Sequence, residues 1–233
     1  MLWMGKDRKQ RTLKAFFQWF GKKRSGALRF VCSDMWRPYV NVVRRSAEDA
    51  LHVLDRFHIA MNLNKAVDQT RRQDAAEFRR RGDKVTLKHT RWCLLKRVAN
   101  LTTRQRGRLR ELLHLNLRTV RAYLLKEDFN HFWEYSSPAF AGNFLDAWCD
   151  RALRSRIEPM QRMARTLESH RELLLNYFRA KKEHNSGVVE GLNNKVKVIT
   201  RRSYGFRVLT TLRIALFHAL GHLPEPEQTH RFA

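Results

Sequence analysis

The pattern of apolar and polar positions predicts alternating short strands and helices in the first quarter of the chain. Apolar runs predict strands at Leu2–Gly5, Leu28–Cys32 and Leu51–Leu54. Apolar residues at helical spacing predict helices at Thr12–Phe20 and from Pro38 to about Arg45, because proline suits a first helical turn. Strands that alternate with helices imply a small parallel sheet.

The rest of the chain has a helical pattern. We expect one long basic helix from Asp55 to about Arg81, and helices through most of Val85–Ala180, where apolar residues recur at helical spacing. Breaks are predicted near Gly82, at Asn100–Thr103 and at Ser136–Gly142. Two more helices follow, one from about Gly187 and one at Leu209–Leu220. The expected fold class is therefore α/β with mostly helical content, in which a large all-α insertion interrupts the α/β part.

Charge narrows the choice of partner. The 233 residues include 47 Lys and Arg but 22 Asp and Glu, which gives a formal net charge of +25. Such a chain favours a polyanion, and a nucleic-acid backbone is the first candidate because each neutralised phosphate releases counterions. A membrane surface is the rival partner, but no apolar run approaches the length that spans a bilayer.

Two acidic residues directly follow predicted strands. Asp34 comes after Leu28–Cys32, and the carboxyl ends of parallel strands face the crevice where ligands bind. Asp34 could equally be a helix cap or a turn residue. Asp55 has the same place after Leu51–Leu54, and a helix cap with His58 at the third helical position explains that pair without any ligand.

The single carboxylate in the basic stretch Ser186–Arg207 is Glu190. On a helix, Glu190 shares one stripe with Asn193, Asn194, Lys197 and Arg201, while apolar residues occupy the other side. A carboxylate beside phosphate-binding cations is the pattern that metal-assisted phosphoryl transfer requires. The alternative is a Glu that merely complements the dipole at a helix N-terminus.

Three stretches together resemble the DDE transposases of bacterial insertion sequences, specifically those of the ISL-three type. They are VCSDMWRPY at 31–39, VLDRFHI at 53–59 and GVVEGLNNKVKVITRRSYGFR at 187–207. The resemblance implies an RNase H-like catalytic domain in which Asp, Asp and Glu bind two divalent ions, Mg²⁺ or Mn²⁺. It also implies an all-helical insertion between the second Asp and the Glu.

Under this resemblance Asp34 is similar to the second Asp and Glu190 to the Glu, so both are expected to be catalytic metal ligands. Asp55 and His58 match an Asp-x-x-His element that would order the site. The DNA-binding residues would be those that the last stretch supplies, namely Asn193, Asn194, Lys197, Arg201, Arg202 and Arg207.

The first Asp of the family has no counterpart before Asp34, because Asp7 lies outside any apolar strand. The resemblance therefore implies a carboxyl-terminal fragment of the catalytic domain, truncated at the N-terminus. Its expected segments are a partial RNase H-like sheet with helices at 1–60, the all-helical insertion at 61–184, helices that complete the catalytic domain at 185–222, and a tail at 223–233.

The complete enzyme would cut and join DNA strands, and we expect these residues alone to bind DNA without chemistry. The alternative is a non-catalytic DNA-binding protein, or a dominant-negative inhibitor that pairs with full-length transposase; an RNA-binding helical protein ranks last. Expected partners are double-stranded DNA, as transposon ends and target, together with full-length transposase or a second copy of the chain. A cytoplasmic, nucleoid-associated location and no membrane partner complete these expectations.

Overall fold

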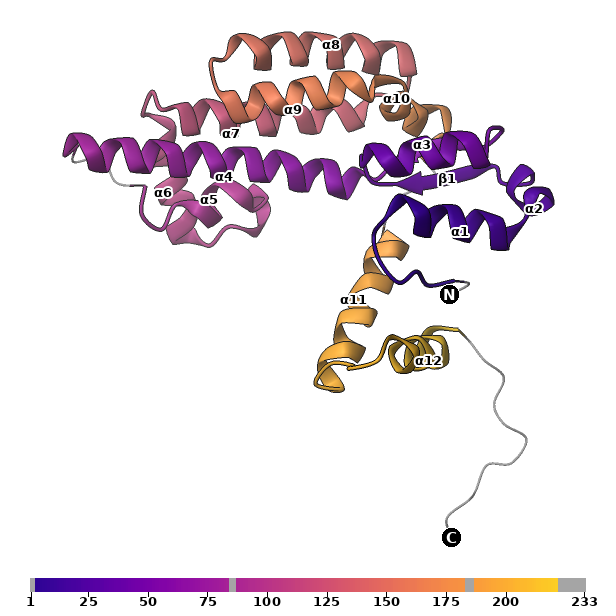
Figure 1. The fold of residues 1–233 in the computed structure, drawn as a ribbon. Coiled ribbons are helices and arrows are strands. Elements are labelled where there is room, and N and C mark those ends of the chain that lie inside the picture. The colour runs from indigo at the N-terminus through magenta and orange to yellow at the C-terminus, as the bar shows by residue number, and fades with distance from the viewer. Residues whose placement is uncertain (1–2, 84–86, 183–186, 222–233) are drawn as a thin grey trace. The chain divides into compact units, whose positions relative to one another are not determined.

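A computed structural model describes residues 3–83, 87–182 and 187–221, except for the side chains of residues 187–190, 192 and 193. The chain divides into two compact units (Figure 1). The first unit comprises residues 1–31, 36–50 and 185–233, and the second comprises residues 32–35 and 51–184.

The described residues are mostly helical, as the pattern predicts, and they contain two short strands where the pattern predicts three. In chain order the elements are α1 (Gln10–Phe20), α2 (Lys22–Gly26), β1 (Phe30–Ser33), α3 (Arg37–Ser46), β2 (Leu51–Leu54), α4 (Arg56–Arg81), α5 (Arg91–Leu95), η1 (Val98–Asn100), α6 (Thr103–Leu113), α7 (Arg118–Phe129), η2 (Asn130–Glu134), α8 (Pro138–Arg154), α9 (Glu158–Ser169), α10 (Arg171–Arg179), α11 (Gly187–Arg202) and α12 (Leu209–Leu220).

β1 and β2 form a two-stranded sheet. The backbone N–H of Asp55 donates to the carbonyl of Ser33 at 2.8 Å, so the residue after β2 is bonded to the last residue of β1. An antiparallel pair would instead bring the end of β1 against the start of β2. The two strands are therefore parallel, as predicted, and α3 lies in the connection between them.

The predicted strand at Leu2–Gly5 is wrong for the residues that the structure describes, because residues 3–5 form no strand. The Trp3 ring packs against Phe16 of α1 instead, with the ring centroids 5.5 Å apart. The second strand begins later than predicted, at Phe30, because Leu28 packs into the apolar cluster of the first unit.

The first unit has a small core between α1 and α3. Phe17 of α1 and Val42, Val43 and Ala47 are buried there, and partly buried side chains pack around them. In the same unit α11 and α12 contact each other, and Leu216 and Leu220 are the buried side chains of α12. The predicted bounds of α12 are confirmed.

The second unit is a helical assembly around α4. α4 contacts α5, α7 and α9, while α8 packs against α9 and α10 (Figure 1). Its core includes Trp148, which is fully buried and donates its indole N–H to the carbonyl of Leu125 at 2.9 Å. α10 packs on β2, and this contact attaches the helical assembly to the sheet.

The predicted breaks hold at two of three places. Gly82 ends α4 with a left-handed φ of 73°, and residues Leu101 and Thr102 separate η1 from α6. The third break is wrong beyond Ser137, because Ser137 caps α8 and the helix continues through Gly142. Gly142 lies close to Arg171: a Cβ at this position would lie 2.7 Å from Nη2 of that side chain, so the guanidinium would have to shift.

A buried carboxylate joins α4 to α7. The N-terminus of α7 receives no cap from its own preceding residue, Leu117. Asp74 of α4 serves instead: it accepts the Thr119 N–H at 2.8 Å, the Thr119 hydroxyl at 2.7 Å and Nε of Arg118 at 2.7 Å. Asp74 is only 2% exposed, so these bonds satisfy a carboxylate that water does not reach.

We predict that Asp74→Ala lowers the free energy of unfolding by about 3 kcal/mol, because it leaves the buried N–H and hydroxyl of Thr119 without their acceptor and removes one of the two carboxylates that bond Arg118. Urea denaturation followed by circular dichroism measures this loss. Asp150→Ala is the control, since Asp150 forms an exposed pair with Arg154 at 3.6 Å and should change stability by less than about 0.5 kcal/mol. Equal losses in the two variants would contradict the assigned role of Asp74.

Candidate metal and nucleic-acid site

Asp34 and Asp55 lie at the same edge of the sheet. Asp34 directly follows β1 and Asp55 directly follows β2, and the strands are parallel. The hydrogen bond from the Asp55 amide to the Ser33 carbonyl fixes the two strand ends side by side. The Asp34 side chain is half-buried, and Asp55 is 8% exposed. The structure thus brings together the two acidic residues that sequence analysis placed at strand ends.

Asp55 caps α4, as its structural interpretation predicts. Its Oδ1 accepts the backbone N–H of Phe57 at 2.8 Å. Its Oδ2 lies 3.6 Å from Nε2 of His58, which is one helical turn further along. Both carboxylate oxygens therefore face groups of the first turn of α4. A further role of Asp55 and His58 in ordering a catalytic site stays a prediction.

Ser33 and His52 form hydrogen bonds next to this edge of the sheet. The Ser33 hydroxyl lies 2.9 Å from the Asp34 carbonyl, to which it donates, and 2.7 Å from Nε2 of His52. Because the hydroxyl has one proton, His52 then donates from Nε2. Asn176 of α10 donates its amide to the His52 carbonyl at 2.9 Å. Sequence analysis missed this set, although a histidine within an apolar strand was a usable signal.

His52 is held neutral by its surroundings. It is 6% exposed, and burial, reinforced by the nearby His170, lowers its pKa to about 4. An imidazole that donates from Nε2 while uncharged fits a fixed position beside Ser33.

The cations of α11 point to solvent. The polar side chains of Asn194, Lys195, Lys197, Arg201 and Arg202 are exposed, and so is that of Val198, whereas Val196 and Ile199 are partly buried. The predicted amphipathic character is confirmed for these side chains, and Arg207, five residues after α11, is exposed as well.

Glu190 and Asn193 lie within α11, but their side chains are outside the described part of the chain. Asp34 and Glu190 belong to different compact units. A metal site that the two residues share therefore stays a prediction, as do the roles assigned to Asn193 and its neighbours. The expected tail at 223–233 also lies outside the described residues.

The donors at the sheet edge suit a hard cation. Carboxylate oxygens are the ligands that Mg²⁺ and Mn²⁺ prefer. Among the side chains that the structure describes, which do not include that of Glu190, no three His, Cys, Asp or Glu side chains gather closely enough to hold an ion by themselves. Asp34 is thus chemically fit to hold a divalent ion, and it needs at least one further carboxylate to do so.

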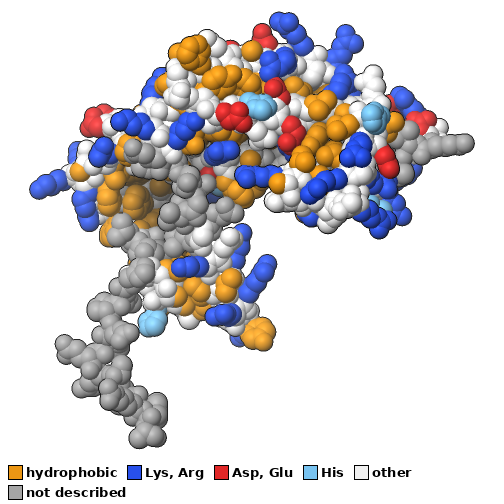
Figure 2. All heavy atoms as spheres, turned by 180° about the vertical axis from the view of Figure 1, so that it is seen from behind, with side chains coloured by type: hydrophobic (Ala, Val, Ile, Leu, Met, Phe, Trp, Pro, Cys, Tyr) orange, Lys and Arg blue, Asp and Glu red, His pale blue; other side chains and the backbone are white. Residues whose placement is uncertain are grey.

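Positive charge is spread over the surface. Lys and Arg side chains are scattered over the described part of the face drawn in Figure 2. The cations of α11, Lys195, Lys197, Arg201 and Arg202, form no ion pair with any other side chain in the described part of the protein. No described helix is both long enough and apolar enough to cross a bilayer.

Comparison with known proteins identifies the family. Residues 1–216 match the family model of ISL-three-type DDE transposases, which is described as "Transposase". The chain belongs to this transposase family.

Two relatives illustrate the similarity. The chain is 32% identical over 209 residues to "Transposase for insertion sequence element IS1001" of Bordetella parapertussis, a match that covers 89% of this chain and 51% of the relative. It is 28% identical over 249 aligned residues to "Transposase for insertion sequence element IS1557" of Mycobacterium tuberculosis, with 96% and 55% covered. The chain spans about half the length of these relatives, and no solved structure matches it.

We predict that the stability of the protein falls by about 2 kcal/mol between pH 7 and pH 5 through His52 alone. The unfolded histidine has a pKa near 6.5 and the folded one about 4, so the unfolded chain binds more protons between these values. Stability is therefore lost as the pH falls through this window. Urea midpoints at both pH values measure the loss.

The matched variant is His52→Gln, which does not titrate and can still donate to Ser33. Its pH dependence between pH 7 and pH 5 should be flatter than that of the wild type by the same about 2 kcal/mol. Parallel pH profiles for the two proteins would show that His52 is not buried in the neutral form.

Proposed function

We propose that the chain is the carboxyl-terminal part of a transposase catalytic domain that cuts and joins DNA strands in a metal-dependent reaction. The observation that carries the proposal is the edge of a parallel strand pair on which Asp34 and Asp55 both lie. Family membership adds the reaction class, and the net charge of +25 fits a DNA substrate. An RNase H-like architecture with a helical insertion is part of this proposal.

Asp34 and Glu190 would hold the divalent ions. When bound, Mg²⁺ would supply positive charge to the attacking and leaving oxygens of a phosphodiester. Asp34 stands at a strand end that its neighbours hold rigidly, since Ser33 bonds both the Asp34 carbonyl and the Asp55 amide. The Asp55 carboxylate caps α4, so Asp55 would contribute by fixing the position of the sheet edge and not by binding an ion.

The polar face of α11 would hold the DNA backbone next to Glu190. Lys197, Arg201 and Arg202 are exposed and lack acidic partners among the described side chains, so their charges are available to phosphates. Asn193, Asn194 and Arg207 would add hydrogen bonds to the same strand. These contacts position DNA without selecting its sequence.

A DDE site uses three carboxylates, and residues 1–233 supply two candidates for it, Asp34 and Glu190. Two ions close together need enough negative charge to balance them. We therefore expect the 233 residues on their own to bind DNA without cutting it, while the complete enzyme does both.

We predict that Mn²⁺ binds between Asp34 and Glu190. In a ¹⁵N-labelled protein, substoichiometric Mn²⁺ should broaden the backbone amide signals of both residues and their neighbours, because the paramagnetic ion relaxes nearby nuclei. Asp34→Asn and Glu190→Gln should each abolish both sets of effects. Asp150→Asn, which changes an exposed carboxylate of α8, is the control. Broadening near only one of the two residues would refute a shared site.

We predict that Lys197→Gln combined with Arg201→Gln weakens binding to duplex DNA and reduces the slope of log K against log salt by about two, one for each lost phosphate contact. Fluorescence anisotropy with a labelled duplex that carries the ends of the encoding element measures both quantities. An unchanged slope of log K against log salt would show that α11 does not contact DNA phosphates.

The same samples, supplied with Mg²⁺ or Mn²⁺, test the chemistry. Binding without nicking is the expected result for residues 1–233. Metal-dependent nicking that Glu190→Gln abolishes would show that these residues are catalytically sufficient. It would also contradict the proposed need for a third carboxylate. Binding that persists in the complete enzyme without any nicking would favour a non-catalytic DNA-binding protein.

A further inference from the structure

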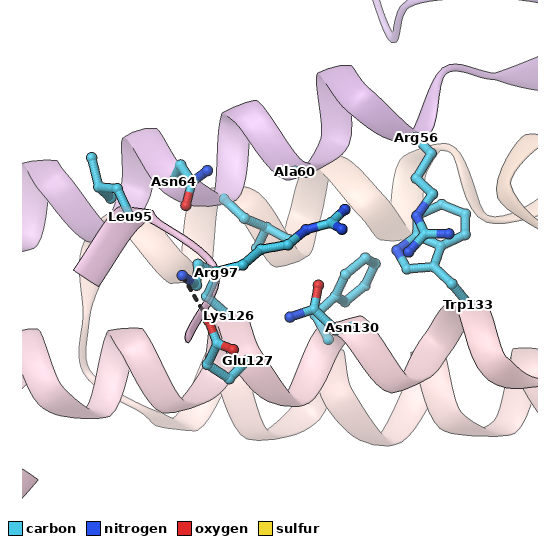
Figure 3. Close-up of a pocket in the computed structure, with 11 residues that line it drawn as sticks. Arg56, Ala60, Asn64, Leu95, Arg97, Lys126, Glu127, Asn130 and Trp133 are labelled. Carbon is cyan, nitrogen blue, oxygen red and sulfur yellow. Dashed lines mark ion pairs between the residues drawn. The ribbon is translucent and has the colours of Figure 1, made fainter. Parts of the chain in front are cut away.

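A small hollow lies in the second unit beside the start of α4. It is bordered by α4, by the segment that follows α5, and by the end of α7 with η2 (Figure 3). Its volume is about 110 Å³. The polar and aromatic side chains in its lining include Arg56, Asn64, Arg97, Lys126, Glu127 and Trp133.

Two guanidinium groups in this hollow have no acidic partner among the described side chains. The Arg56 guanidinium lies over the Trp133 ring, 5.1 Å from its centroid, and the Arg97 side chain extends across the hollow (Figure 3). Neither arginine forms an ion pair within the described residues. The one carboxylate in the lining, that of Glu127, forms an ion pair with Lys126. Nζ of Lys126 lies 2.7 Å from Oε1 of Glu127. The hollow therefore keeps about two uncompensated positive charges.

A buried amide in the wall is also incompletely bonded. Oδ1 of Asn64 is inaccessible to solvent and has no hydrogen-bond partner in the described part of the protein. A buried polar atom without a partner costs about 1–3 kcal/mol. An occupant could donate to this oxygen, or the amide could turn by 180° and offer its NH₂ group to an acceptor.

Size limits the class of occupant. The hollow, with a volume of about 110 Å³, has room for several water molecules. Pockets that enclose drug-sized ligands have roughly 300–1,000 Å³, so this hollow is too small to enclose a whole nucleotide. A tetrahedral anion fits, and guanidinium groups bind phosphate oxygens through paired N–H donors.

We propose that this hollow binds a phosphate group of a DNA strand. The proposal rests on the DNA-binding function proposed above, and it adds a contact site on the helical unit. Arg56 and Arg97 donate to the phosphate oxygens, with the exposed amide of Asn130 beside them, while Trp133 keeps the Arg56 guanidinium in place. Arg56 directly follows Asp55, so a strand held here passes close to the acidic edge of the sheet.

Inorganic phosphate and DNA serve as separate probes. The indole N–H signal of Trp133, assigned with Trp133→Phe, should shift when phosphate replaces chloride at constant ionic strength. The indole signals of Trp19 and Trp92, which are exposed and lie outside the hollow, should stay in place. Saturating DNA should shift the Trp133 signal as well. If DNA binds but leaves that signal unchanged, its phosphates are not the occupant and the proposal fails.

The charge variant is Arg56→Gln combined with Arg97→Gln. It should weaken DNA binding about five- to tenfold and reduce the salt slope by about one. Arg104→Gln with Arg110→Gln is the matched control, because it removes the same charge from two exposed arginines of α6 in the same unit. An equally large effect in the control would mean that only overall charge matters, and would overturn the site.

The variant Asn64→Leu distinguishes a loss of phosphate binding from a loss of folding stability. This variant keeps both arginines, removes the unpaired buried oxygen and fills part of the hollow, so the melting temperature should be unchanged or higher. The phosphate-induced shift of Trp133 should nevertheless be lost. A normal phosphate response in Asn64→Leu would show that the anion does not enter the hollow.

Discussion

The hydrogen bond from the Asp55 amide to the Ser33 carbonyl, 2.8 Å long, determines what this chain can present at its sheet edge. It sets the ends of two parallel strands against each other, so the acidic residues after both strands face the same side. Ser33 adds a second constraint, because its hydroxyl bonds the Asp34 carbonyl and the buried imidazole of His52. The helical unit supports the edge, because α10 packs on β2 and its Asn176 donates to the His52 carbonyl. Positioned carboxylates of this kind are what metal-assisted chemistry needs.

The uncompensated positive charge lies where Lys and Arg side chains have no acidic partner. Inside the helical unit, the acids of α4 are used for structure: Asp74 and Glu77 contact Arg118, and Asp68 contacts Arg71 and Arg72. The cations of α11, and Arg56 and Arg97 at the hollow beside α4, have no such partners among the described side chains. With 22 acids for 47 cations, many cations must remain uncompensated, and a phosphate backbone offers the charge that the chain lacks. Charge compensation thus distinguishes the helices that hold the unit together from the cations that remain available for the proposed DNA contacts.

Local patterns predicted much of the fold. β2, α12 and the cap of α4 by Asp55 could be read from apolar runs and from the position of one acid, because each depends on neighbours in sequence. The strand expected at Leu2–Gly5 failed because a short apolar run cannot show whether a partner strand is at hand, and Trp3 packs on α1 instead. The Asp74 cap of α7 and the hollow of Arg56 and Arg97 were not predictable either. Each joins residues more than 40 positions apart in the chain, and no periodicity records such contacts.

The start of α4 gives a physical reason why the edge and the hollow belong together. A helix N-terminus carries partial positive charge, so an arginine as its first residue is unfavourable unless negative charge lies nearby. Asp55 supplies one carboxylate, but its oxygens face Phe57 and His58 rather than the Arg56 guanidinium. Arg56 instead stacks on Trp133, which holds the guanidinium at the hollow without neutralising it. A phosphate bound there would compensate the charge of the arginine and the partial charge of the helix N-terminus. Because Asp55 and Arg56 are consecutive residues, the proposed phosphate contact would lie next to the proposed catalytic edge.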